Sequence, residues 1–234
     1  MTAGVTEFLF TFSLNLYKQL LVEQGAKGNI LFSPFGVAAV LSMTLAGARN
    51  STETQILNVL NANHNGSGQR TIHEQFESIL GHLETLAPDA SLFVANRIYA
   101  SLEFAPLPEY ASLLHKYYHS SLETADFRRD PEDVRRRMNA WVEVKTGSRI
   151  ADFLSPGTLS QETRVVALDA VYFKGLWESQ FNAELTSREE FHGADGVVKM
   201  VDMMSRRGKF RMGHSAELGV TALEIPYRGT GFSM

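Results

Sequence analysis

The segment VVALDAVYFKGLW, from Val165 to Trp177, has the pattern of a buried β-strand. Successive side chains of a strand point to opposite faces, and here both faces are apolar except at Asp169. A strand of this kind is covered on both sides inside a protein. Because a buried carboxylate without a partner is costly, we expect Asp169 in a buried polar cluster. The alternative is a strand face that is partly exposed to solvent at this point.

Length and composition are those of an ordinary globular protein with ample material for a core. The chain has 234 residues, of which 44% are hydrophobic and 21% charged, and its net charge is −4. This mild acidity provides no basic surface for nucleic acid or an anionic membrane. The chain contains no cysteine, which excludes disulfides, thiol catalysis and cysteine-based zinc sites.

The amino-terminal segment predicts a core-facing helix rather than a targeting or membrane segment. It has no basic start, carries Glu7, and is interrupted by Asn15, unlike a secretory signal. No run of about 18 apolar residues occurs, so the sequence offers no candidate membrane span. Apolar side chains recur at helical spacing at Phe8, Phe12, Leu16 and Leu20.

Helical patterns dominate the first two thirds of the chain and strand patterns the last third. Ser33 and Pro34 predict the start of a buried helix, and Gly47 fits just past its end. Residues 90–101 have the pattern of a strand, and from Arg164 onward the chain has the pattern of strands and hairpins. This order predicts an α+β fold with helices packed on sheets.

The sequence contains none of the common catalytic signatures. It lacks the G-x-S-x-G elbow, a phosphate loop, G-x-G-x-x-G and H-E-x-x-H, so we expect no enzyme, cofactor or metal site. His115 and His119 lie four residues apart in a predicted helix and could share one face as metal ligands. No third ligand stands nearby, which favours a solvated face instead.

Five arginines fall in the segment FRRDPEDVRRRM, residues 127–138. They could attract a polyanion of the heparin type. Acidic residues are interleaved with them at helical distances, which favours ion pairs within the helix over a polyanion site.

Two N-glycosylation sequons begin at Asn50 and Asn65. Both fall in predicted loops, where a glycan would be accessible. One or two sequons are expected by chance in a chain with this many asparagines, so they favour secretion only slightly.

Several motifs together resemble the serpin family. The segment DAVYFKGLW with Phe181 resembles the family pattern N-x-x-[YF]-F-K-G-x-W…F. NILFSP, from Asn29 to Pro34, resembles the signature N-[IV]-x-[FI]-S-P. The spacing holds from about Asn29 to Tyr227. Further matching positions are Thr52, Gln55, Leu60, Asn139, Val142, Thr146, Ile150, Thr186, Phe191, Val201, Met203 and Met204.

This resemblance implies the serpin α+β fold, with amino-terminal helices on one large central sheet plus further strands. It also implies inhibition of a serine endopeptidase. The protease cleaves an exposed reactive loop, the loop inserts into the sheet as an extra strand, and the acylated protease is distorted. The alternative within the family is a non-inhibitory ligand carrier or chaperone, which the residues of the hinge before the loop would distinguish.

The residues implied by the resemblance are conformational rather than catalytic. One group matches the "shutter" beneath the sheet, where strands part: Ser33, Pro34, Gly36 and Asp169. A second group matches the "breach", where insertion begins: Lys174, Gly175 and Trp177.

Two departures from the family pattern fall in the shutter. The family usually has Asn where this chain has Asp169, so two amide donors are lost. Gly36 stands where a second serine is common, so one hydroxyl is lost. We hypothesise that Asp169 makes opening of the sheet pH-sensitive, because its charged form has no donor to offer.

The end of the sequence carries further expectations. EIPYRGTGFSM has the pattern of a strand and turn leading into another strand at Met234. We therefore expect an incomplete carboxyl end, with residues 1–234 forming a single partial serpin domain. The reactive bond would then be absent from this chain, and the target protease could not be identified from it. We expect an extracellular protein, with an intracellular one as the alternative because no signal peptide is visible.

Overall fold

The structure is a computed structural model, and it describes residues 3–25, 28–62, 69–84, 90–104, 106–193, 195–229 and 231–234. The chain divides into two compact units. The first unit comprises residues 1–25, 30–85 and 92–172, and the second comprises residues 26–29, 86–91 and 173–234. The single domain over residues 1–234 stays a prediction.

The first unit contains six helices and a three-stranded sheet among its described residues. The helices are α1 (Ala3–Gln24), α2 (Pro34–Gly47), α3 (Asn50–Val59), α4 (Gln69–Glu84), α5 (Pro108–Tyr118) and α6 (Pro131–Lys145). The strands are β1 (Ala90–Ser101), β2 (Ser121–Ala125) and β3 (Val165–Gly175), of which β3 continues into the second unit.

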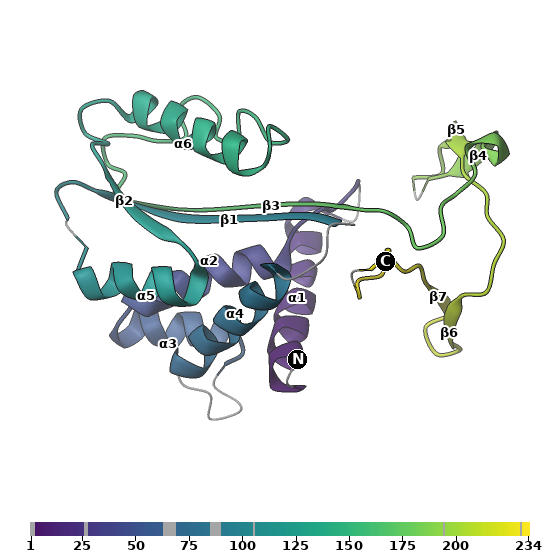
Figure 1. Cartoon of the computed structure of the whole chain (residues 1–234), viewed down its shortest axis with the longest axis horizontal. Coiled ribbons are helices and arrows are strands. Elements are labelled where there is room, and N and C mark those ends of the chain that lie inside the picture. Colours follow the sequence, from purple (N-terminus) through teal and green to yellow (C-terminus); the bar gives the residue numbers. More distant parts are fainter. Residues whose placement is uncertain are drawn as a thin grey trace. The chain divides into compact units, whose positions relative to one another are not determined.

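The sheet has the strand order β2-β1-β3. β1 and β2 pair in parallel, from Arg97 opposite Ser121 to Ser101 opposite Ala125. The N–H of Ser101 donates to the carbonyl of Arg164 at 2.8 Å, so the end of β1 lies beside the start of β3. Figure 1 shows α6 on one face of the sheet and the other helices of this unit on the opposite face.

Each face of the sheet has its own core. The core on the face of α1, α2, α4 and α5 includes Ala167 of β3, and the core on the face of α6 includes Leu168 and Ala170. The predicted burial of both faces is therefore confirmed for the middle of β3. The first residue of the strand differs, because Val165 is 61% exposed.

Local sequence explains the helices next to the sheet. The Ser33 hydroxyl accepts a hydrogen bond from the N–H of Gly36 at 3.1 Å, which caps α2 as predicted. Pro34 is the first residue of that helix, where its missing N–H costs nothing. In α1, Phe8 and Phe12 are buried, which confirms that this helix faces the core. No helix among the described residues is long and apolar enough to span a membrane.

The second unit consists largely of hairpins. β4 (Ser187–His192) pairs antiparallel with β5 (Val198–Met203), and β6 (Arg211–Ser215) pairs antiparallel with β7 (Val220–Glu224). A single 3-10 turn, η1 (Ala183–Leu185), precedes β4. The strands and hairpins predicted after Arg164 are thus confirmed.

Candidate functional site

The carboxylate of Asp169 lies over the first turn of α2. Asp169 has the same strand parity as Ala167, whose side chain packs in the core around α2. A Cβ atom added to Gly36 would lie 1.8 Å from Oδ1 of Asp169 and 2.6 Å from its Cγ. Because Gly36 has no side chain, the carboxylate of Asp169 can occupy the space above it.

Asp169 is a partly buried acid with a poorly satisfied carboxylate. Its Oδ2 atom is buried and has no hydrogen-bond partner among the described residues. Burial raises the pKa of Asp169 from 3.8 to about 6. At neutral pH the group is therefore ionised at a cost in free energy, and below about pH 6 it holds a proton that it can donate.

The structure brings the four predicted shutter residues to one place, the start of α2 beneath β3. Ser33 and Gly36 are joined by the capping hydrogen bond, and Gly36 contacts Asp169. No hydrogen bond between Ser33 and Asp169 is present in the described part of the chain, so these two side chains do not form the expected polar cluster. That these residues form a shutter stays a prediction.

A cluster of aromatic rings in the second unit holds the end of β3 and the residues that follow it. The ring of Trp177 stacks on that of Tyr227, with centroids 4.4 Å apart and an interplanar angle of 11°. Phe173 meets the same tyrosine edge-on at 5.0 Å. A Cβ atom on Gly175 would lie 2.6 Å from Cδ1 of Tyr227, so the ring packs directly over the glycine backbone.

Backbone hydrogen bonds reinforce this cluster. The N–H of Arg228 donates to the carbonyl of Leu176 at 2.8 Å, and the N–H of Glu178 donates to that of Pro226 at 3.0 Å. Gly175 and Trp177 of the predicted breach thus share one cluster, whereas the side chain of Lys174 is exposed. Sequence reasoning did not identify Tyr227 as their partner, although an aromatic residue in the last predicted strand was a signal.

The two histidines do not form a shared helical face. α5 ends at Tyr118, and His119 follows it with a left-handed backbone, at φ 48°. The prediction that both histidines lie on one helix was therefore wrong. In the described part of the chain, no group of three or more His, Cys, Asp or Glu side chains could hold a metal ion.

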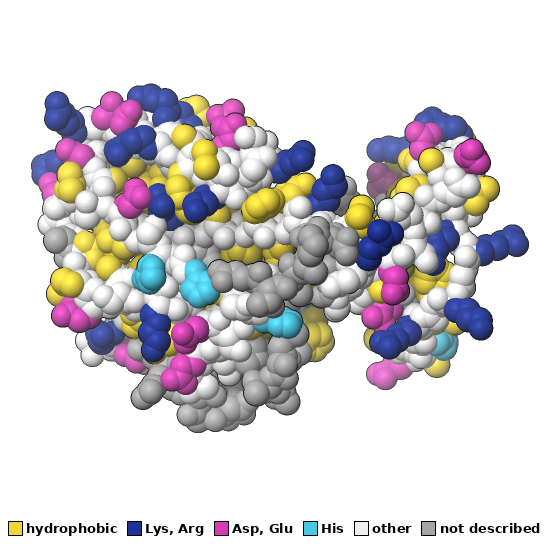
Figure 2. Space-filling view, in the orientation of Figure 1, with side chains coloured by type: hydrophobic (Ala, Val, Ile, Leu, Met, Phe, Trp, Pro, Cys, Tyr) yellow, Lys and Arg dark blue, Asp and Glu magenta, His cyan; other side chains and the backbone are white. Residues whose placement is uncertain are grey.

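The arginines around the start of α6 make ion pairs as predicted. Arg135 pairs with Glu132 at 2.7 Å, and both Arg136 and Arg137 pair with Asp133, at 3.4 and 3.1 Å. Figure 2 shows basic and acidic side chains intermixed over this helix. The absence of a polyanion site there stays a prediction.

The sequon at Asn50 does not lie in a loop. Asn50 is the first residue of α3 and is exposed, with a left-handed backbone at φ 56°. The prediction of a loop was wrong because this helix begins earlier than its sequence signals indicate. The second sequon, at Asn65, lies outside the described residues.

Comparison with known proteins decides the family. A family model described as Serpin (serine protease inhibitor) matches residues 9–234. The chain belongs to the serpin family. The family description names protease inhibition rather than catalysis.

Relatives and solved structures agree with this assignment. Iris of Ixodes ricinus is 44% identical over 235 residues, which cover 100% of this chain and 61% of that protein. Leukocyte elastase inhibitor A of Mus musculus is 35% identical and covers 95% of this chain and 58% of its own length. The structure of ovalbumin from the emu, Dromaius novaehollandiae, matches with a TM-score of 0.91 and 31% identity, covering 98% of this chain and 62% of ovalbumin.

The predicted serpin-like α+β fold is thereby confirmed. The serpin chain spans about 61% of the length of Iris.

Proposed function

We propose that this serpin inhibits a serine protease by accepting a cleaved loop as a new strand beside β3. The family supports the inhibitory function, and one relative is named as an inhibitor of leukocyte elastase. The observation that carries the proposal is the edge of β3. This strand pairs with β1 on one side and with no described strand on the other. Its free N–H and C=O groups are therefore available to a further strand.

In this proposal, Ser33, Pro34, Gly36 and Asp169 form the shutter on which β3 moves. One oxygen of the Asp169 carboxylate, Oδ2, is buried without a hydrogen-bond partner among the described residues, so the ionised group weakens the closed arrangement above about pH 6. Any movement that hydrates or pairs this carboxylate relieves that cost. Opening of the sheet is therefore easier at neutral pH than in acid.

Lys174, Gly175 and Trp177 form the breach in the same proposal. The stack of Trp177 on Tyr227 fixes the backbone where β3 ends. An entering strand needs a fixed starting register, because a shift by one residue would turn every side chain to the wrong face.

The test uses the complete protein product that carries this sequence. It is mixed with trypsin, chymotrypsin and elastase, and the products are separated in SDS. We expect loss of activity of at least one protease together with an SDS-resistant complex of one inhibitor and one protease. Cleavage of the protein without a complex and without loss of protease activity would favour the non-inhibitory carrier or chaperone instead.

We also propose an extracellular location, with glycosylation at Asn50 or Asn65. The exposure of Asn50 supports this. The mass of the protein from its natural source, measured before and after treatment with an N-glycosidase, tests the proposal. An unchanged mass would favour the intracellular alternative.

A further inference from the structure

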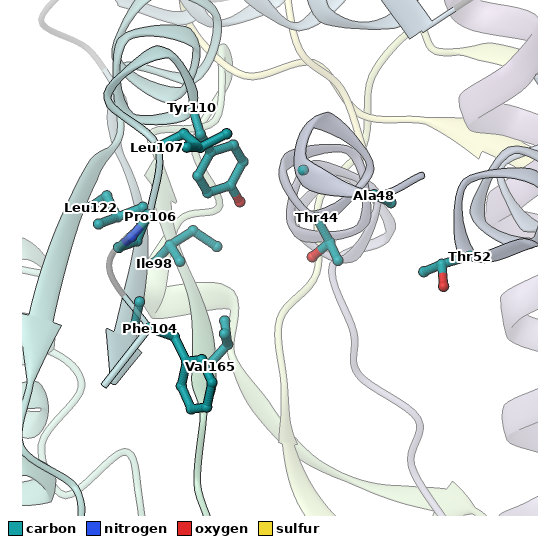
Figure 3. A pocket seen from close by; sticks show the side chains of 12 residues that line it. Thr44, Ala48, Thr52, Ile98, Phe104, Pro106, Leu107, Tyr110, Leu122 and Val165 are labelled. Carbon is teal, nitrogen blue, oxygen red and sulfur yellow. The ribbon is translucent and has the colours of Figure 1, made fainter. Parts of the chain in front are cut away.

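A pocket of about 460 Å³ lies in the first unit, between its helices and its sheet (Figure 3). Its walls come from the end of α2, the start of α3, the start of α5 and all three strands. Its size falls within the range of small-molecule sites in proteins, about 300–1,000 Å³. The proposed inhibition does not use this pocket.

The pocket has a buried apolar floor and an exposed apolar mouth. Ile98 of β1, on the floor, is 2% exposed. Phe104, Leu107 and Val165 line the pocket and are 56%, 70% and 61% exposed. A cluster of large, solvent-exposed apolar side chains around a cavity is typical of a binding site rather than of ordinary protein surface.

None of the described residues that line the pocket is a Lys, Arg, Asp, Glu or His. An ionic ligand would therefore lose its hydration without gaining a counter-charge, which is costly. The lining thus selects a neutral ligand.

The hydroxyl groups of the pocket add a second criterion for the ligand, namely which hydrogen-bonding group it must carry. Figure 3 shows the hydroxyl end of Tyr110 directed toward α2, the helix that carries Thr44. The Tyr110 hydroxyl donates to the carbonyl of Met43 at 3.1 Å, and the Thr44 hydroxyl donates to that of Val40 at 2.9 Å. A hydroxyl has one hydrogen, so both groups have only lone pairs left for a ligand. Thr52 supplies a third hydroxyl from α3.

We infer that this pocket binds a neutral, largely apolar small molecule that carries a hydroxyl group as a hydrogen-bond donor. The apolar body fills the space between Ile98 and the mouth. The hydroxyl donates to the oxygen of Tyr110 or Thr44. Such a ligand contacts α2 and the sheet together, so its binding stabilises the folded first unit by mass action.

Three probes of one shape test the chemistry, and their binding is measured by calorimetry. They are 2-naphthol, a donor; 2-methoxynaphthalene, which cannot donate; and 2-naphthoate, an anion. We expect 2-naphthol to bind tightest, the methoxy compound to bind roughly threefold to tenfold more weakly, and the anion at least about tenfold more weakly. Equal affinities, tighter binding of the anion, or no binding of 2-naphthol would overturn the inference.

A matched pair of variants places the site. Thr44→Leu fills the pocket and removes one acceptor. Thr54→Leu removes the same type of hydrogen bond, from Thr54 to the carbonyl of Asn50 at 3.1 Å, outside the pocket. We expect Thr44→Leu to weaken 2-naphthol binding about tenfold or more and Thr54→Leu to leave it unchanged. Equal affinity of the two variants would contradict the site.

A second pair tests the hydrogen bond without altering the shape of the pocket. Tyr110→Phe should reduce the preference for 2-naphthol over 2-methoxynaphthalene by threefold or more. The preference that remains should be the one that the Thr44 hydroxyl provides as the remaining acceptor. Tyr117→Phe, on the same helix but outside the pocket, should leave the preference unchanged. Circular dichroism confirms the folding of each variant, and an unchanged preference in Tyr110→Phe would exclude Tyr110 as an acceptor.

Discussion

At the scale of single residues, Gly36 and Asp169 form a matched pair. Each differs from the residue that the family resemblance implies, and the structure shows that the two residues fit together. The carboxylate fills the space above Gly36 that a side chain there would need. We therefore expect the energetic effects of substitutions at the two positions to be coupled.

Adding one methyl group at Gly36 tests this pairing. Gly36→Ala should lower the free energy of unfolding by about 1–3 kcal/mol through overpacking against Asp169, even though alanine favours a helix by about 1 kcal/mol. In an Asp169→Ala background the same change should be neutral or stabilising. Urea unfolding of the four proteins of this double-mutant cycle provides the measurement, and equal costs in both backgrounds would argue against the pairing.

Two buried groups give the stability opposite dependences on pH. Asp169 has a raised pKa, about 6 against 3.8, so the folded state binds the extra proton and stability falls as pH rises from about 4 to 6. His73 in α4 bonds the Tyr118 hydroxyl at 2.5 Å, and burial lowers its pKa from 6.5 to about 4. The unfolded state then binds the extra proton, so stability rises over about pH 4 to 6.5.

The variants Asp169→Asn and His73→Gln should separate these two effects. Relative to wild type, Asp169→Asn should gain on the order of 2–3 kcal/mol between pH 4 and 6.5, because one pKa unit corresponds to about 1.4 kcal/mol. His73→Gln should instead lose stability as pH rises over this range. Thermal unfolding from pH 4 to 8 checks both, and a profile of Asp169→Asn parallel to wild type would remove Asp169 as a pH-sensitive group.

The sequence was sufficient to predict that Asp169 lies on a core-facing side of β3 and that Ser33 caps α2. Both features depend on neighbouring residues, through strand alternation and capping. It was not sufficient to predict that Asp169 occupies the space above Gly36. That contact joins two segments far apart in the chain, and local patterns carry no information about their separation in space.

At the scale of elements, β3 is the part of the fold that sequence reasoning described best. Its apolar faces meet two separate cores, as the alternation predicted. The partners of its last residues were not predictable in the same way. The stack of Trp177 on Tyr227 depends on a chain reversal between them, which spacing alone does not define.

A methyl group at the end of β3 should disturb this stack. Gly175→Ala places a Cβ atom 2.6 Å from Tyr227 and 2.8 Å from Phe173, so the rings must move. We expect a loss of near-ultraviolet circular dichroism and about 1–3 kcal/mol of lower stability. Gly213→Ala is the matched control, because it adds a methyl group within β6 where nothing lies within 4 Å. Identical spectra for both variants would show that the stack tolerates the change.

At the scale of the whole molecule, much apolar surface is exposed on the hairpins of the second unit. Phe191, Val198 and Met200 of β4 and β5 are about half exposed, at 54%, 48% and 49%. Strands with such surfaces and open edges associate readily with one another. Apolar sheet surface is thus exposed on these hairpins.

We expect residues 1–234 by themselves to self-associate at micromolar concentration. Sedimentation velocity measures the association, and replacing Val198 and Met200 by Lys should reduce it because charges on strands oppose edge pairing. A monomer with one sharp, cooperative unfolding transition would show that this expectation is wrong.

The central proposal is that β3 accepts a further strand. Its most direct test compares the unfolding temperature of the complete protein product before and after a single cleavage by a serine protease. Insertion of the cleaved segment beside β3 would add a strand worth several kcal/mol. Because 1 kcal/mol corresponds to about 2–4 °C in a protein of this size, we expect a rise of about 10 °C or more. An unchanged or lower unfolding temperature, with both cleavage products still associated, would contradict the proposal.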